Sequence, residues 1–283
     1  MIAESSGRID LHLHTTASDG HCTPRELVER SERAGVSVMA VTDHDTTAAV
    51  AEVRTAARER GIQTISGIEV TAVDDGRDIH VLGYFCDPND PALGSFLLAQ
   101  RAARVERVRA IAAQLATLDV PIQVDPLVAQ AAAGIGRSIG RPQVARAMME
   151  AGHVASIQEA FDRWLAHRRP GFVPRAGASS AVVIGVIHAA GGIASLAHPG
   201  KLGLDLRVRE LALAGLDAVE VFHPDHDAAL VERYRALARE LGLFMTGGSD
   251  FHGEPSHGRE PGDVSVPVAE FERFCGARRD VLG

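Results

Sequence analysis

Side chains that could bind a metal ion lie close together in residues 9–20, which read IDLHLHTTASDG. His12 and His14 are two residues apart in an apolar run, and Asp19 follows after a short polar turn. Side chains two apart on a β-strand point to the same face of the sheet, so both imidazoles can reach one ion. Such pairs also arise by chance in a chain with 13 histidines, so a metal site requires further ligands.

Five further apolar segments end in, or contain, residues that can bind metal: residues 38–44, 64–69, 78–85, 193–198 and 243–252. Together with the first segment they supply nine donors, none of them cysteine: His12, His14, Asp19, His44, Glu69, His80, His198, Asp250 and His252. Imidazole and carboxylate ligands suit manganese, zinc or iron. Nine donors exceed the capacity of one ion, so the sequence predicts two or three divalent ions, with Glu69 as the simplest bridging carboxylate.

A cluster of this composition is suited to the hydrolysis of phosphate esters. One ion lowers the pKa of a bound water, while the others bind phosphoryl oxygens and the leaving alkoxide. Asp19 and Glu69 are therefore candidate catalytic carboxylates as well as ligands. His223, at a strand end in VEVFHP, is predicted either as the general acid for the leaving group or as a phosphate ligand.

Several cations are candidates for binding a substrate anion. Arg141 stands in GRP just before an expected helix, where a helix N-terminus and a guanidinium together could bind phosphate; a simple surface turn is the alternative. Lys201 could act as a point charge on phosphate. Arg168 and Arg169 follow Trp164, so this loop either stacks on and neutralises a nucleotide or is merely solvated.

Other charged residues have a simpler interpretation. The arginines of the segment RAARVERVR, at positions 101, 104, 107 and 109, are expected on a solvated helix face. Asp43 and Asp45, on either side of His44, are expected either to orient its imidazole ring or to cap a helix.

Alternating strands and helices are expected to position the ligands. Helices are predicted at 24–34 and 46–61, each followed by glycine or ending in it, and buried strands precede and follow them. This order is typical of a parallel α/β sheet, whose sites gather at the carboxyl ends of the strands. His12, His14, His44 and Glu69 are therefore expected at such ends.

The pattern changes between residues 91 and 180, where strands are no longer indicated and helical spacing prevails. The alternation then returns with helices near 180–190, 206–213 and 228–241 and strands ending at residues 198, 222 and 252. A short closing helix is expected after residue 267. The first and last strands of a closed barrel are neighbours, so both ends of the chain can share the metal site.

Composition limits the class of protein. The 283 residues suffice for one barrel-sized domain with an insertion, and the net charge of −8 argues against binding long duplex nucleic acid. The three cysteines, Cys22, Cys86 and Cys275, lack paired spacing and favour a reducing cytoplasm. No segment resembles an export signal or a membrane span, so no membrane partner is expected.

The ordered motifs DLHLHTTASDG, TDHD, GIE, HVLGYF, AHPG and GSDFH resemble those of the polymerase and histidinol phosphatase (PHP) superfamily. GRPQVARAMMEAG and VEVFHP resemble its branch of nucleoside 3′,5′-bisphosphate phosphatases and 5′ to 3′ exoribonucleases acting on short RNA. The resemblance implies a distorted seven-stranded α/β barrel in two parts, 1–92 and 180–283, with a helical substrate-capping insertion at 93–179.

The resemblance also implies a distribution of ligands over three ions. His12, His14, Glu69 and Asp250 would bind the first ion; Glu69, His80 and His198 would bind the second; Asp19, His44 and His252 would bind the third. The sequence departs from the superfamily pattern at His21 and Cys22 after DG, and in the arginine-rich AHRRPGF.

The function expected from these features is metal-dependent hydrolysis of phosphate monoesters of nucleotides, such as AMP or a nucleoside 3′,5′-bisphosphate, or of 5′-phosphorylated short oligonucleotides. One alternative is a histidinol-phosphate phosphatase, which the helical insertion disfavours. The other is a non-catalytic metal-binding module of a larger assembly, which the complete ligand set disfavours.

Overall fold

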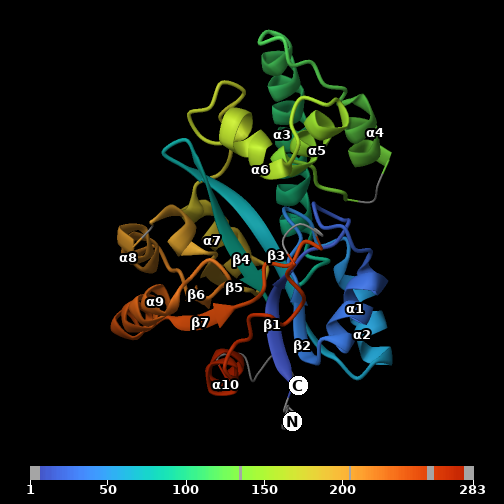
Figure 1. Ribbon diagram of the computed structural model, residues 1–283. Coiled ribbons are helices and arrows are strands. Elements are labelled where there is room, and N and C mark those ends of the chain that lie inside the picture. Colours follow the sequence, from blue (N-terminus) through green and yellow to red (C-terminus); the bar gives the residue numbers. More distant parts are fainter. Residues whose placement is uncertain (1–6, 134–135, 204, 254–257, 277–283) are drawn as a thin grey trace.

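The structure is a computed structural model that describes residues 7–133, 136–203, 205–253 and 258–276. Its seven strands form one sheet in the order of the chain: β1 (Arg8–Leu13), β2 (Val36–Val41), β3 (Gln63–Asp74), β4 (Arg77–Tyr84), β5 (Ile193–Leu196), β6 (Ala218–Phe222) and β7 (Phe244–Gly247). The sheet curves until the chain after β7 meets β1, where Leu13 bridges Phe251 and the N–H of His14 donates to the carbonyl of Phe251. The result is the distorted barrel predicted from the sequence (Figure 1).

Helices cover the barrel on its sides and at both ends (Figure 1). α1 (Pro24–Arg33) and α2 (Val50–Glu59) lie on one side, and α7 (Ser180–Ala189), α8 (Asp205–Leu213) and α9 (Ala228–Leu241) lie on the other. α10 (Val268–Gly276) is the closing helix expected after residue 267. A 3-10 turn, η2 (Pro199–Leu202), follows β5.

The predicted parallel order holds for β1, β2 and β3, whereas β4 runs antiparallel to both β3 and β5. Asp75 and Gly76 join β3 to β4 with positive φ angles of 51° and 73°. Consecutive residues of positive φ form the tight turn that twists two strands into a hairpin. β3 therefore continues to Asp74 instead of ending at Glu69, and the hairpin extends past the barrel.

The helix boundaries follow local capping. α1 begins as predicted, because the side chain of Thr23 accepts from the N–H of Glu26 and the carboxylate of Glu26 accepts from the N–H of Thr23. α2 begins at Val50 and not at residue 46 as predicted. Asp45 has a φ of 51°, and Thr46 accepts from the N–H of Ala48, so the chain first makes a turn.

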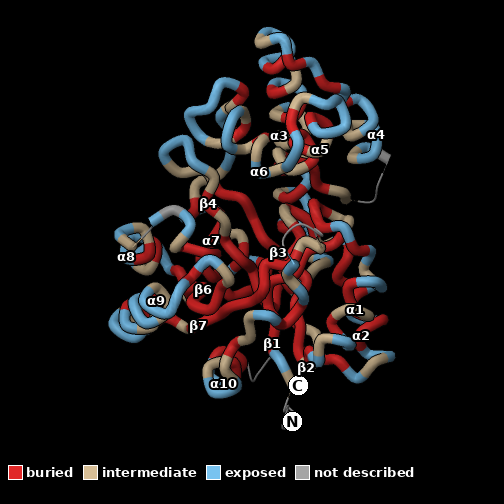
Figure 2. The backbone as a smooth tube through the Cα atoms, in the orientation of Figure 1, coloured by how far each residue is buried: buried red, intermediate tan, exposed pale blue. Residues whose placement is uncertain are grey.

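A helical segment lies between β4 and α7, over the projecting hairpin (Figure 1). It contains α3 (Pro91–Ala116), α4 (Asp125–Ala133), α5 (Arg141–Glu150), α6 (Ile157–Ala160) and the π-helical turn η1 (Phe161–Leu165). Its apolar side chains form a buried cluster of their own, which includes Ile111, Leu115, Val144 and Met148. The barrel strands carry most of the remaining buried surface (Figure 2). In the part of the chain that the structure describes, no helix has the length and apolar character needed to span a bilayer.

Candidate metal centre

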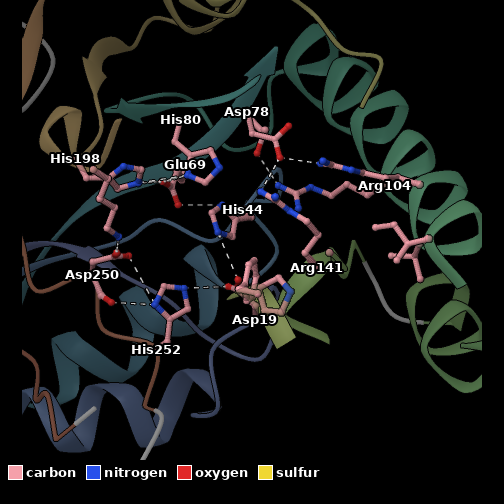
Figure 3. Close-up of a pocket in the computed structure, with 18 residues that line it drawn as sticks. Asp19, His44, Glu69, Asp78, His80, Arg104, Arg141, His198, Asp250 and His252 are labelled. Atoms are coloured by element: carbon pink, nitrogen blue, oxygen red, sulfur yellow. Dashed lines mark hydrogen bonds and ion pairs between the residues drawn. The ribbon is translucent and has the colours of Figure 1, made fainter. Parts of the chain in front are cut away.

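The nine predicted donors converge at the barrel end that faces the helical segment (Figure 3). His44, His198, Asp250 and His252 follow the carboxyl ends of β2, β5 and β7, and Asp19 lies in the loop between β1 and α1. The expectation of strand ends was wrong for Glu69, which lies within β3, whereas His12 lies one residue before the carboxyl end of β1. His80 lies within β4, opposite Thr71 of β3.

Glu69 is the centre of the cluster. Its Oε2 lies 3.5 Å from Nε2 of His12, 3.4 Å from Nε2 of His14 and 2.9 Å from Nδ1 of His44. Its Oε1 lies 2.8 Å from Nδ1 of His80 and 3.1 Å from Nε2 of His198. The two oxygens of one buried carboxylate thus face two different groups of imidazoles, which is the arrangement expected of a bridging ligand.

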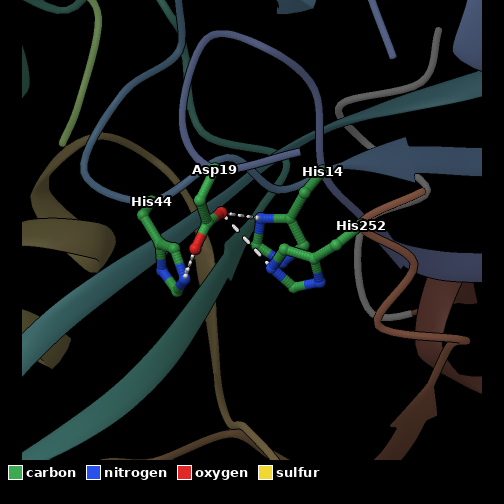
Figure 4. A group of neighbouring side chains, drawn as sticks. All are labelled: His14, Asp19, His44 and His252. Atoms are coloured by element: carbon green, nitrogen blue, oxygen red, sulfur yellow. Dashed lines mark ion pairs between the residues drawn. The ribbon is translucent and has the colours of Figure 1, made fainter. Parts of the chain in front are cut away.

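Two further carboxylates complete the cluster. Oδ1 of Asp250 lies 3.4 Å from the Nε2 atoms of both His12 and His14. Asp19 lies 3.5 Å from Nε2 of His44 and 3.3 Å from Nε2 of His252 (Figure 4). His14 takes part in both groups, because its Nδ1 lies 3.8 Å from Asp19.

These residues fit divalent metal ions. Two ligand atoms that each lie about 2.1 Å from one ion are roughly 3.0–3.4 Å apart, close to most of the separations given above. Among the described residues, the buried atoms without a hydrogen-bond partner include Nε2 of His12, both ring nitrogens of His14, Nδ1 of His44 and Oε2 of Glu69. Buried polar atoms normally have partners, so their concentration here indicates a missing ligand.

The electrostatics favour ionised carboxylates. Burial would raise the pKa of Glu69, but the charges of His44 and His80 hold it well below its ordinary value. Burial lowers the pKa of His14 to about 3, so this imidazole is neutral and ready to bind metal. Burial also disfavours protonation of His252, yet Asp19 raises its pKa to about 9. A metal ion must displace such protons, so its binding strengthens as the pH rises.

The backbone is strained close to the ligands. Asp45, His198 and Asp250 have φ angles of 51°, 29° and 50°, in the region that residues other than glycine rarely occupy. At Gly248, between β7 and Asp250, a Cβ atom would collide with the backbone nitrogen of His12. A glycine is therefore required for the close approach of β7 to β1 that brings Asp250 to the histidines.

Glu220 of β6 supports the ligands from behind, and the sequence analysis missed it. Its Oε1 lies 2.8 Å from Nδ1 of His12, and its Oε2 accepts from the N–H of His198 at 2.7 Å. Burial would raise the pKa of Glu220, but His12 lowers it to about 2. A fully buried glutamate inside the apolar strand AVEVF was the signal that could have identified it.

Replacing Glu220 with glutamine should lower metal affinity and kcat by about 10- to 100-fold, the usual effect of losing a partner of a metal-binding histidine. When Nε2 of His12 binds metal, Nδ1 carries a proton, and the amide has one oxygen for the two N–H donors of His12 and His198. Metal content and steady-state rates would measure the loss. Glu240→Gln, an exposed control, should match wild type, and wild-type metal content in Glu220→Gln would contradict the assignment.

Asp43 and Asp45 do not contact the His44 ring, so neither orients it as expected. Asp43 accepts from the N–H and hydroxyl of Thr15 and from the hydroxyl of Ser18, which fixes the loop that carries Asp19. Asp45 accepts from the N–H of Thr71 and from two arginines, described next. Both aspartates therefore hold ligand-bearing segments together.

A cavity of about 380 Å³, here called the first cavity, opens between the candidate metal ligands and the helical segment (Figure 3). Arg104, Arg107 and Arg141 line it. Arg107 and Arg141 bind Oδ2 of Asp78 at 2.7 and 3.0 Å, and Arg104 binds Asp45 at 2.5 Å. The expectation of a solvated helix face was therefore wrong for Arg104 and Arg107, whose side chains are only 12% and 9% exposed.

The helix α3 explains this correction. Arg104, Arg107 and Ile111 are three or four residues apart and share one face, and all three line the first cavity. Arg101 lies one turn earlier and donates to the backbone carbonyl of Asp45. Arg109, on another face, is exposed and pairs with Glu106 as expected of a solvated residue.

Of the other residues predicted to bind substrate, only Lys201 lines the first cavity. Lys201 lies 2.7 Å from Asp250. Arg168 and Arg169 are exposed and are not among the residues that line this cavity. His223 is buried behind Asp250, at 3.3 Å, and is not among the residues that line the cavity.

The structure defines a class of protein: a distorted α/β barrel with a group of histidines and carboxylates at one end. The PHP domain family matches residues 10–166. A 3′,5′-nucleoside bisphosphate phosphatase from Chromobacterium violaceum is 32% identical over 259 residues, which cover 90% of each chain. A 5′-3′ exoribonuclease, Rnm, from Escherichia coli is 35% identical over 250 residues, 86% of this chain and 84% of the relative.

A solved structure gives the same result. A proposed metal-dependent phosphoesterase from Bifidobacterium adolescentis has a TM-score of 0.86 at 32% identity, and the match covers 98% of this chain and 99% of that one. The chain therefore belongs to the PHP family. The family and the fold predicted from the sequence are both confirmed.

Proposed function

We propose that this chain is a metal-dependent phosphoesterase that hydrolyses phosphate monoesters of nucleotides or short 5′-phosphorylated oligonucleotides. The observation that carries the proposal is the continuity of nine metal-type donors with a cavity lined by three arginines. The phosphatase and exoribonuclease relatives support the same class of reaction and a small phosphorylated substrate. The cytoplasm is the proposed location, supported by Cys22, Cys86 and Cys275, which form no disulfide within the described part of the chain.

The ligand assignment belongs to this proposal. His12, His14, Glu69 and Asp250 would hold one ion; Glu69, His80 and His198 a second; Asp19, His44 and His252 a third. Two or three divalent ions of manganese, zinc or iron would supply an activated water and neutralise phosphoryl oxygens. Glu69 and Asp19 act as ligands that hold this arrangement, while Glu220 keeps the His12 ring in position.

Other side chains handle the substrate. Arg141, Arg107 and Arg104 line the first cavity from the helical segment and would bind a second phosphate or the next nucleotide. Lys201 would bind phosphoryl oxygens beside Asp250. His223 accepts from the N–H of Asp225 through Nδ1, so its neutral ring carries the proton on Nε2, toward Asp250. We assign it to positioning Asp250, because it does not line the cavity.

A comparison of hydrolysis rates tests the proposed function, with inorganic phosphate measured for the monoesters and nucleoside 5′-monophosphate measured for the oligonucleotides. With Mn²⁺, kcat/KM should be highest for adenosine 3′,5′-bisphosphate or a 5′-phosphorylated di- or trinucleotide, lower for AMP and lowest for histidinol phosphate, because only the first group offers a second anion to the arginines. Duplex DNA should be inert. A preference for histidinol phosphate would overturn the nucleotide assignment, and release from none of these substrates would overturn the phosphoesterase itself.

Arg141→Ala is the matched variant for this comparison. The loss of a charged hydrogen bond to phosphate should weaken transition-state binding of the bisphosphate by about 1.5–3 kcal/mol. This change lowers its kcat/KM roughly 10- to 150-fold. The decrease for AMP should be smaller, since AMP has no second phosphate. Arg109→Ala, an exposed arginine on the same helical segment, is the control. Equal decreases for both substrates would show that Arg141 does not recognise the second phosphate.

A further inference from the structure

A second cavity adjoins the first and has no role in the proposed reaction on a nucleoside bisphosphate. Its volume is about 290 Å³, and it lies between α5, α6 and the loop after β7. Six residues line both cavities: Asp19, Pro142, Phe161, Lys201, Asp250 and His252. Three of the six are predicted metal ligands, so a phosphorus atom held by the metal ions would be accessible from both cavities.

The residues that line only the second cavity suit an anionic chain. They are Arg146, Ile157, Gln158, Gly253 and Arg259, two cations and no acid. Arg259 binds Oδ1 of Asp225 at 2.8 Å, and Lys201 lies 3.4 Å from the other oxygen of the same carboxylate. Arg146 donates to the backbone carbonyl of Asp19 at 2.7 Å, which places its guanidinium beside a metal ligand. Arg146 and Arg259 therefore place guanidinium donors in this second arm, next to the candidate metal ligands.

Phe161 and Pro142 stand at the boundary between the two cavities. The guanidinium of Arg141 lies 5.7 Å from the centre of the Phe161 ring, on the side of the first cavity. An aromatic ring at a boundary of this kind can stack on a base without selecting its identity. The boundary thus separates two arms that meet only at the ligands and Lys201.

A phosphate monoester carries one organic substituent and requires one arm, whereas a phosphodiester carries two. We infer that the second cavity binds the nucleotide beyond a scissile phosphodiester, with Arg259 and Arg146 as the contacts for the 3′-phosphate of that nucleotide. This inference rests on the proposed function and defines its substrate class. The leaving 5′-phosphorylated nucleoside would occupy the first cavity, with its phosphate on Arg141 and Arg107, and the rest of the chain would occupy the second.

The reaction balances as a hydrolysis. Water adds its oxygen to phosphorus, the bond from phosphorus to the 3′-oxygen of the first nucleotide breaks, and that oxygen takes up a proton. The products are a nucleoside 5′-monophosphate with a free 3′-hydroxyl and a chain shortened by one residue that bears a 5′-phosphate. A nucleoside 3′,5′-bisphosphate has the same leaving group, but no part of it reaches the second cavity.

The test compares adenosine 3′,5′-bisphosphate with the 5′-phosphorylated triadenosine ribonucleotide on the Mn²⁺-loaded enzyme. Arg259→Ala should lower the ratio of kcat/KM for the trinucleotide to kcat/KM for the bisphosphate by about tenfold or more, because only the trinucleotide places a phosphate in this arm. Arg259→Lys should restore part of the ratio. Gln158→Trp, which fills the cavity from the exposed surface of α6, should lower the same ratio.

The outcomes separate the two proposals. Turnover of both substrates by wild type, with a lower ratio in Arg259→Ala and Gln158→Trp, supports the second arm. Turnover of the bisphosphate but not the trinucleotide, or a ratio unchanged in both variants, overturns the inference and leaves the proposed function standing. Turnover of neither substrate overturns the proposed function as well. Arg209→Ala, which removes an exposed arginine paired with Glu240, controls for a general loss of positive charge.

Discussion

Glu69→Gln should lose about three orders of magnitude in kcat together with most of its bound metal. An orienting partner outside the ligand shell is worth 10- to 100-fold, and Glu69 is a direct ligand candidate that contacts five imidazoles through both oxygens. The amide keeps the shape of the side chain but carries no charge, and only one of its two atoms can accept. Two groups of histidines then lose their common anion.

Metal analysis and rates measured on the same preparation would test this expectation. A chelator should abolish phosphate release from the wild-type protein, and added Mn²⁺ should restore it, whereas added Mn²⁺ should restore little activity to Glu69→Gln. Glu59→Gln, an exposed glutamate at the end of α2, is the matched control. Full activity in a metal-free wild-type preparation would refute a metal-dependent mechanism.

The cluster of candidate ligands could be predicted because its members occupy similar positions relative to the apolar segments of the sequence. Each lies at the end of a buried strand, within one, or just after one, and hydrophobic runs that contain histidine or carboxylate are rare without a function. His12 with His14 and Asp250 with His252 also repeat the two-residue spacing of a strand. A short local pattern was therefore sufficient to identify nine donors.

The supporting residues could not be predicted in the same way, because their partners are distant in sequence. Glu220 lies 208 residues from His12, and Arg104 lies 59 residues from Asp45. From the sequence alone, an arginine on a helix of mixed polarity cannot be distinguished from a solvent-exposed one. Its partner is found only when the segment that packs against the helix is known. The antiparallel β4 was missed for a related reason: Asp75 and Gly76 are a hairpin signal of only two residues within a segment that otherwise reads as strand.

Asp45→Asn should lower the free energy of unfolding by about 3–5 kcal/mol, the usual cost of leaving a buried charge without its partner. Asp45 is fully buried, and its Oδ2 accepts from Nε of Arg104 at 2.5 Å and from Nη2 of Arg175 at 3.1 Å. Arg175 is only 1% exposed, and burial lowers its pKa to about 10. Asparagine would leave two buried guanidinium groups with no counter-charge.

This network connects the metal centre to the helical segment. Arg104 belongs to α3, and Arg175 lies in the stretch that returns from the helical segment to the barrel. Asp45 itself donates its N–H to the carbonyl of Glu69 and accepts from the N–H of Thr71, so it holds the backbone on both sides of the bridging ligand. Its loss should therefore raise KM as well as lower stability, since α3 carries the arginines of the first cavity.

Thermal and urea unfolding in the presence of a chelator would measure the stability change without a contribution from metal binding. Burial would raise the pKa of Asp45, but Arg104 and Arg175 hold it below its ordinary value, so the stabilisation is present at neutral pH and is lost as the pH falls through the folded-state pKa. The difference between wild type and Asp45→Asn should therefore shrink in acid. Glu106→Gln, which breaks the exposed pair with Arg109, should change stability by less than about 1 kcal/mol at any pH. If Asp45→Asn unfolds like wild type at neutral pH, the ion pairs of Asp45 with Arg104 and Arg175 contribute no net stability.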